Sequence, residues 1–181
     1  MPVIEPENLK DTVAIFAVDG GTTTGVARGI FPAYADSTWE GLAAGRWESW
    51  EVEGPIAEQC WEIIGEYADW IGWPECKPMD ELHVKSRHLV FEDFVVRLGT
   101  GASSKRVLLD PVRVASGCDV LCKTREGLRW AFPEYQQASV AKNYATNERL
   151  RAHGMWVKGS EHRRDAVRHM CCRYATLLGD K

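Results

Sequence analysis

The chain has 181 residues, 45% of them apolar and 27% charged, which is typical of a globular domain and excludes a disordered or fibrous chain. No apolar run reaches the roughly 18–20 residues of a membrane-spanning helix, and the acidic first segment, MPVIEPENLKDT, lacks the basic and then apolar pattern of a signal peptide. We therefore expect a single cytoplasmic domain over residues 1–181, with no membrane partner.

The net charge of −4 is distributed unevenly along the chain. Residues 1–96 carry a net charge of −12, whereas residues 97–173 carry +8. Such asymmetry allows a basic surface on an acidic protein and hence a nucleic-acid partner. Solvated helix faces without any ligand would give the same charges, so this observation leaves both possibilities open.

Six cysteines occur, but none forms a CxxC pair and no secretory signal accompanies them. A structural zinc site or a disulfide framework is therefore a weak interpretation. We expect buried or incidental thiols.

The first half of the chain predicts three strands and then a helix. The apolar run at 12–19 and the next run at 24–31 flank GGTT, which predicts a hairpin whose turn geometry comes from Gly20 and Gly21. Alternating residues within 45–54 predict a third strand. Apolar residues at helical spacing between Pro55 and Pro74 then predict a helix.

The second half alternates strands and helices. The pattern predicts a buried strand over 87–97, a glycine- and serine-rich loop, a helix over 111–125, a strand or extended segment over 128–138, and helices over 139–152 and 161–178. This order predicts an α/β fold with a mixed five-stranded sheet, in which three antiparallel strands are followed by crossover-connected parallel strands, flanked by helices.

Several carboxylates occupy positions that are typical of a core. Asp19 ends an apolar strand, and Glu92 and Asp93 interrupt the run HLVFEDFVV. Burying an ionised carboxylate is costly without a partner, so each of these charges needs an explanation. Taken singly, Asp19 could cap a turn and Glu92 could pair with an arginine.

The last helix contributes further polar groups. His162, Asp165, His169 and Cys172 share one helix face. Asp165 alone could merely counter the helix dipole. Together, separated carboxylates from two strands and a helix are suited to Mg²⁺, and paired ions of this kind can hydrolyse phosphodiesters.

On these residues the chain resembles the RuvC-type Holliday-junction resolvases, of the divergent kind found in phages. The matching residues are Asp19 in VDGG, Glu92 in VFED, and His162 with Asp165 in HRRDA. The resemblance covers about residues 12–178 and implies a ribonuclease-H-like fold. The chain departs from the bacterial pattern at Gly20, where a proline is usual.

The resemblance implies a metal-dependent endodeoxyribonuclease with two Mg²⁺ or Mn²⁺ ions per site. A metal-activated water would attack the phosphodiester in line and leave 5′-phosphate and 3′-hydroxyl ends. Asp19 would bridge the ions, and Glu92, Asp165 and His162 would complete their coordination. Because histidine suits Mn²⁺ somewhat better than Mg²⁺, we expect Mn²⁺ to support activity at least as well. Lys142 is the candidate basic residue near the scissile phosphate.

The expected partner is branched DNA, including four-way junctions and possibly flaps and forks. A junction with approximate two-fold symmetry implies a homodimer, and a phage-encoded chain would act in the host cytoplasm. The residues expected to contact DNA, through phosphates or, for the aromatic one, at the junction centre, are Lys105, Arg106, Lys142, Arg163, Arg164 and Phe94.

Three alternatives remain open from the sequence. The first is a related ribonuclease-H-fold nuclease that acts on flaps, forks or RNA. The second is an ATPase or kinase of the sugar-kinase and actin superfamily, because VDGGTTTG resembles its first phosphate loop; the chain shows no second DxGxT segment and no Walker motif. The third is a DNA-binding module without catalysis.

Overall fold

The computed structural model describes residues 11–70, 84–93, 109–124 and 133–180. Within these residues the strands are β1 (Thr12–Asp19), β2 (Thr24–Pro32), β3 (Arg46–Val52), β4 (Val84–Asp93) and β5 (Glu134–Gln137). The helices are α1 (Thr38–Ala44), α2 (Ile56–Trp70), α3 (Asp110–Thr124), α4 (Ala138–Tyr144), α5 (Asn147–Ala152) and α6 (Glu161–Leu178). The predicted order of strands and helices is confirmed, with the differences given below.

The strands of the described residues form one mixed sheet in the order β3-β2-β1-β4-β5. β1 pairs with β2, and β2 with β3, in antiparallel register, whereas β1–β4 and β4–β5 are parallel. This is the predicted α/β arrangement of a meander followed by crossover-connected strands.

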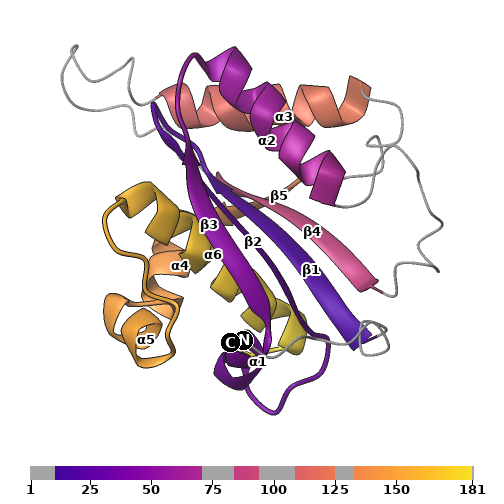
Figure 1. The fold of residues 1–181 in the computed structure, drawn as a ribbon, viewed down its shortest axis with the longest axis vertical. Coiled ribbons are helices and arrows are strands. Elements are labelled where there is room, and N and C mark those ends of the chain that lie inside the picture. Colours follow the sequence, from indigo (N-terminus) through magenta and orange to yellow (C-terminus); the bar gives the residue numbers. More distant parts are fainter. Residues whose placement is uncertain (1–10, 71–83, 94–108, 125–132, 181) are drawn as a thin grey trace.

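Helices cover both faces of the sheet (Figure 1). α2 and α3 lie on one face, and α6 lies on the other together with α1, α4 and α5. Successive side chains of a strand point to opposite faces, so each strand contributes to two cores. Val13, Ile15 and Ala17 of β1 pack in the core with α6, while Phe16 and Val18 pack in the core with α2 and α3.

This alternation determines which polar groups face α6. Asp19 continues the series of Val13, Ile15 and Ala17, so its side chain lies on the α6 face. On β4, Val90 belongs to the α6 core, which places Glu92 on that face as well. The sheet thus directs both carboxylates toward the same helix.

The structure adds one helix to the predicted elements and divides another in two. α1 was not predicted; Ser37 caps it by accepting a hydrogen bond from the amide of Glu40, and buried Leu42 anchors it. The predicted helix over 139–152 is two helices, because the chain breaks at Ala145 and Thr146 caps a new helix by accepting from the Arg149 amide. β4 ends at Asp93, and the predicted strand residues 94–97 lie outside the described residues.

The role predicted for the glycines of the first hairpin is wrong. The hairpin forms, but neither Gly20 nor Gly21 has a positive φ. Both positions are instead crowded: a Cβ on Gly20 would lie 3.2 Å from the Pro111 backbone, and one on Gly21 would lie 3.2 Å from the His162 ring. Close packing, rather than turn geometry, explains these glycines.

Gly25 allows α6 to begin directly against the sheet. It is the register partner of Asp19 on β2, and a Cβ there would lie 2.1 Å from the carbonyl oxygen of His162. Only a residue without a side chain permits this approach. Gly25 therefore holds the start of α6 beside the end of β1.

We expect Gly25→Ala to destabilise the fold by about 2–4 kcal/mol, because the helix backbone must move away from β2. Urea unfolding measures this loss. Gly65→Ala is the matched control: Gly65 lies in α2 with no atom within 4 Å of the added Cβ, so the same substitution should be neutral or stabilising by up to about 1 kcal/mol. Equal stabilities for the two variants would contradict this account of Gly25.

The cysteines of the described residues are free and buried, as expected: Cys60, Cys118, Cys122, Cys171 and Cys172. Cys76 lies outside the described residues.

Among the described helices, none is both long and apolar enough to cross a membrane.

Candidate active site

The predicted catalytic residues meet at one cleft of about 380 Å³, although they come from four different elements. β1 contributes Asp19, β4 contributes Glu92, α4 contributes Lys142, and α6 contributes His162 and Asp165. The cleft is also lined by residues of the first hairpin loop and of two helices, namely Gly20, Gly21, Thr22, Thr23, Pro111 and Glu161.

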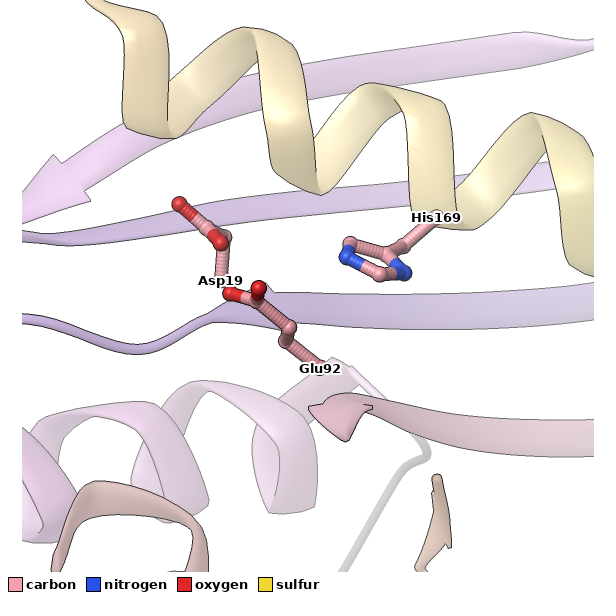
Figure 2. Close-up of side chains that lie close together, drawn as sticks. All are labelled: Asp19, Glu92 and His169. Carbon is pink, nitrogen blue, oxygen red and sulfur yellow. The ribbon is translucent and has the colours of Figure 1, made fainter. Parts of the chain in front are cut away.

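Two residues that line this cleft, Asp19 and Glu92, form a group of potential metal ligands with buried His169. Asp19, Glu92 and His169 each offer one ligand atom, and these atoms lie within 4.8 Å of one another. Figure 2 shows the two carboxylates side by side, with the His169 ring of α6 directed toward them. Asp19 is 4% exposed and His169 is 1% exposed, whereas Glu92 is only partly buried.

The pKa values of the neighbouring carboxylates Asp19 and Glu92 are shifted in opposite directions. Burial would raise the pKa of Asp19, but hydrogen bonds from His162 and Glu92 outweigh it and hold that pKa below its usual value. Burial, together with the hydrogen bond to Asp19 and the Asp19 charge, raises the pKa of Glu92 to about 9. Two adjacent carboxylates thus retain a proton between them at neutral pH.

His162 contacts Asp19 directly. Its Nδ1 lies 2.9 Å from Asp19 Oδ2, and 44% of its side chain is exposed. The hydrogen bond to Asp19 raises the pKa of His162 despite partial burial. Because the carboxylate can only accept, His162 Nδ1 donates to Asp19 and fixes the orientation of this carboxylate. His162 is thus hydrogen-bonded to one member of the Asp19–Glu92–His169 group and is not itself part of that group.

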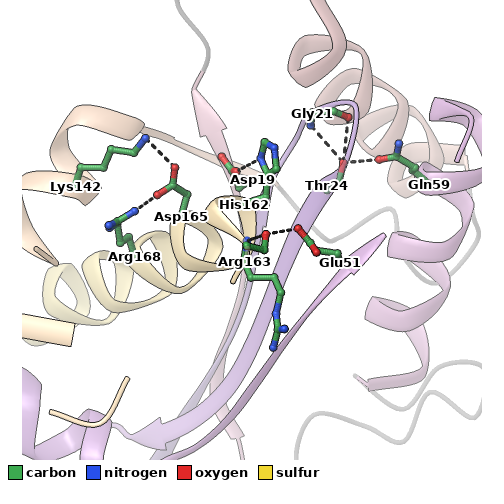
Figure 3. A network of polar contacts seen from close by, with 11 residues as sticks. Asp19, Gly21, Thr24, Glu51, Gln59, Lys142, His162, Arg163, Asp165 and Arg168 are labelled. Carbon is green, nitrogen blue, oxygen red and sulfur yellow. Dashed lines mark hydrogen bonds and ion pairs between the residues drawn. The ribbon is translucent and has the colours of Figure 1, made fainter. Parts of the chain in front are cut away.

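Asp165 lies between two cations (Figure 3). Lys142 Nζ is 2.8 Å from Asp165 Oδ2, and Arg168 donates to the other carboxylate oxygen. The pairing with Asp165 outweighs burial and raises the pKa of Lys142. Arg168 is itself buried and also donates to Ala145 and Asn147, which ties α6 to the break between α4 and α5.

The sequence-based site omitted His169. Its helix face was recognised, but a buried histidine on a helix is commonly part of the core, and its position beside Glu92 depends on the sheet. The spacing of His169 from His162 and Asp165 was the available signal.

The residues predicted to contact DNA lie in different surroundings. Lys142 lines the cleft and is 46% exposed. Arg163 instead donates to the Ser49 carbonyl at 2.8 Å, and Arg164 donates to the Gly159 carbonyl at 2.8 Å and stacks over Trp156. These two arginines are thus engaged within the protein, and their role in DNA binding remains a prediction. Lys105, Arg106 and Phe94 lie outside the described residues.

The first hairpin loop is held by its own polar groups and by α2. The Gly21 amide donates to Thr24 Oγ1 at 3.3 Å, and the Thr24 hydroxyl donates to buried Gln59. Gln59 in turn donates to the carbonyl oxygens of Thr22 and Gly54 (Figure 3 shows Gly21, Thr24 and Gln59). Because these groups are already paired, the loop is better explained as a rigid wall of the cleft than as a phosphate cradle.

The fold belongs to the ribonuclease-H-like class, defined by the β3-β2-β1-β4-β5 mixed sheet with helices on both faces and polar residues at the ends of β1 and β4. Among solved structures, the chain is similar to RuvC of T. thermophilus in complex with a Holliday junction substrate. The TM-score is 0.53 at 10% sequence identity, and the match covers 92% of this chain and 97% of the RuvC chain. No family model matches the sequence, and no curated protein does.

The donor set fits a divalent cation. Two carboxylates and an imidazole converge, and burial together with the neighbouring Asp19 raises the pKa of Glu92. Oxygen donors with one nitrogen suit Mn²⁺ and also accommodate Mg²⁺. Asp19, Glu92 and His169 are therefore the residues that would hold the ion.

Proposed function

We propose that this protein is a divalent-metal-dependent endonuclease that resolves four-way junctions and other branched DNA. The observation that carries the proposal is the group of Asp19, Glu92 and His169, whose two carboxylates line a cleft together with His162, Asp165 and Lys142. The similarity of the fold to RuvC bound to a junction supports this substrate class.

A bound divalent cation would supply Lewis-acid stabilisation of the phosphate and a water of lowered pKa. The residues of the chain have distinct roles in this proposal. Asp19 and Glu92 provide oxygen ligands, His162 keeps Asp19 in its orientation, and the ammonium group of Lys142 contacts the scissile phosphate. Hydrolysis would leave 5′-phosphate and 3′-hydroxyl ends.

Two matched nicks are needed to resolve a junction, and the junction has approximate two-fold symmetry. We therefore propose that the active form is a two-fold homodimer with one cleft facing each cut strand. The proposed DNA contacts beyond Lys142 are Lys105, Arg106, Arg163, Arg164 and Phe94.

The test incubates labelled four-way junctions, flaps, linear duplex and single-stranded RNA with the protein in Mg²⁺, Mn²⁺ or EDTA. We expect junction cleavage with both ions, at least as fast with Mn²⁺, and none in EDTA. Faster cleavage of flaps or RNA than of junctions would contradict the proposed substrate class but would leave the proposed metal-dependent hydrolysis in place. No cleavage of any substrate, or cleavage in EDTA, would overturn the proposal.

The ion pairs of Asp165 lead to a prediction about metal stoichiometry. Because Lys142 and Arg168 neutralise Asp165, the free protein should bind one Mn²⁺ tightly, at Asp19, Glu92 and His169, and a second only weakly. Lys142→Gln removes one of these cations and should strengthen the second site by about tenfold or more.

Isothermal titration calorimetry with Mn²⁺ in the absence of DNA measures both sites. Lys158→Gln is the matched control, since Lys158 is exposed and does not line the cleft. Two equally tight ions in the wild-type chain would show that the ion pairs do not oppose metal binding.

A further inference from the structure

His169 forms a hydrogen bond with a side chain that has no role in the proposed reaction, that of Gln136. Its Nδ1 lies 2.9 Å from Gln136 Oε1, and the other ring nitrogen, Nε2, is directed toward Asp19 and Glu92 (Figure 2). Both ring nitrogens of this buried histidine therefore have a defined neighbour.

The sheet register explains why Gln136 is available at this position. Gln136 is the register partner of Glu92 on the adjacent parallel strand, so the two side chains lie on the same face of the sheet. α6 crosses this face and places His169 over both. Gln137, the next residue of β5, is exposed, and its side chain belongs to the opposite face of the sheet.

The contact selects one form of the imidazole. Because an amide oxygen only accepts a hydrogen bond, the Gln136 oxygen favours the tautomer with the proton on Nδ1, and Nε2 of the neutral ring then carries the lone pair. A lone pair directed at two carboxylates is the arrangement of a nitrogen ligand, and a second partner behind a metal-binding histidine commonly raises metal affinity by about 10–100-fold.

We propose that Gln136 is a positioning residue that makes His169 a nitrogen ligand and thereby favours Mn²⁺ over Mg²⁺ at this site. The proposal rests on the metal-dependent function proposed above, and it adds the pair of residues that sets the choice of metal. Mg²⁺ prefers oxygen ligands, so losing the nitrogen should affect it less.

The experiment compares Gln136→Leu with Gln136→Glu and with the control Gln137→Leu, all in the full chain. Mn²⁺ and Mg²⁺ affinities are measured by isothermal titration calorimetry, and the histidine tautomers of the metal-free protein by long-range ¹H–¹⁵N NMR. Gln136→Leu should weaken Mn²⁺ binding at least tenfold, and Mg²⁺ binding less than about threefold. Gln136→Glu keeps an acceptor oxygen and should retain Mn²⁺ binding, as should Gln137→Leu.

The NMR measurement does not depend on activity. In the wild type, His169 should be protonated at Nδ1, and this signature should be lost in Gln136→Leu but kept in Gln136→Glu. Protonation of wild-type His169 at Nε2, or unchanged Mn²⁺ affinity in Gln136→Leu, would overturn the inference even if the protein cleaves junctions. A wild type that binds Mn²⁺ with these properties but cleaves no nucleic acid would instead overturn the nuclease function alone.

Discussion

Asp19→Asn is expected to reduce junction cleavage by at least about a thousandfold, which corresponds to roughly 4 kcal/mol of transition-state stabilisation. Asparagine lacks the negative charge and one of the two oxygens that a cation would bind. The amide oxygen can still accept the hydrogen bond from His162, so the geometry around the end of β1 should persist. Single-turnover cleavage of a labelled four-way junction in Mn²⁺ measures the loss.

The variant should keep its affinity for the junction in EDTA, because Asp19 is buried and contributes no positive charge to phosphate binding. It should also lower the pKa of His162, since the hydrogen bond to the Asp19 carboxylate is what raises that pKa. Asp36→Asn is the control for the substitution itself, because Asp36 is exposed and does not line the cleft. Cleavage by Asp19→Asn within about tenfold of wild type would show that Asp19 is not an essential metal ligand and would contradict the proposed mechanism.

The sequence predicted the sheet and the position of Asp19 because both depend on local alternation. Val13, Ile15 and Ala17 form the apolar series that Asp19 interrupts, and this series alone places Asp19 on one face. The choice between Glu92 and Asp93 also follows from alternation once Val90 is known to face α6. Asp93 is exposed, so Glu92 is the member of the pair that enters the cleft.

Contacts between distant segments could not be predicted in this way. The pairing of Lys142 with Asp165 depends on how α4 packs against α6, and no spacing in the sequence encodes it. The pairing of Arg168 with Asp165 differs, because the two residues lie three positions apart on α6. The contact of His169 with Gln136 depends on the register of β5 beside β4. α1 was missed for a different reason: a short helix is marginal on its own and is stabilised here by tertiary contacts, including that of buried Thr38 with Asp180.

Glu92→Gln is expected to stabilise the metal-free protein while abolishing its stabilisation by Mn²⁺. In the wild type, the folded-state pKa of Glu92 is about 9 against 4.5 in the unfolded chain, so the folded state holds an extra proton between these values. The contribution of Glu92 to stability is present below pH 4.5 and is lost as the pH rises toward 9. Glutamine does not titrate, so the advantage of the variant should grow with pH over this window.

The groups that face Glu92 come from three other elements, and all of them remain in the variant: Asp19 on β1, Lys142 on α4, and Asp165 and His169 on α6. Because Glu92 is only partly buried, solvent screening limits the gain, and we expect about 1–2 kcal/mol at pH 8, or roughly 3–6 °C in melting temperature.

Thermal unfolding from pH 5 to pH 9, in EDTA and in Mn²⁺, measures both effects, and Asp93→Asn is the control on the exposed neighbouring residue. Mn²⁺ should reverse the order of wild type and Glu92→Gln, because only the wild type keeps both carboxylates as ligands. A Glu92→Gln protein that is less stable than wild type in EDTA at pH 8, or that gains as much from Mn²⁺, would show that Asp19 and Glu92 are not held together for a cation. The destabilisation that Glu92 causes in the metal-free protein would then not be explained by metal binding.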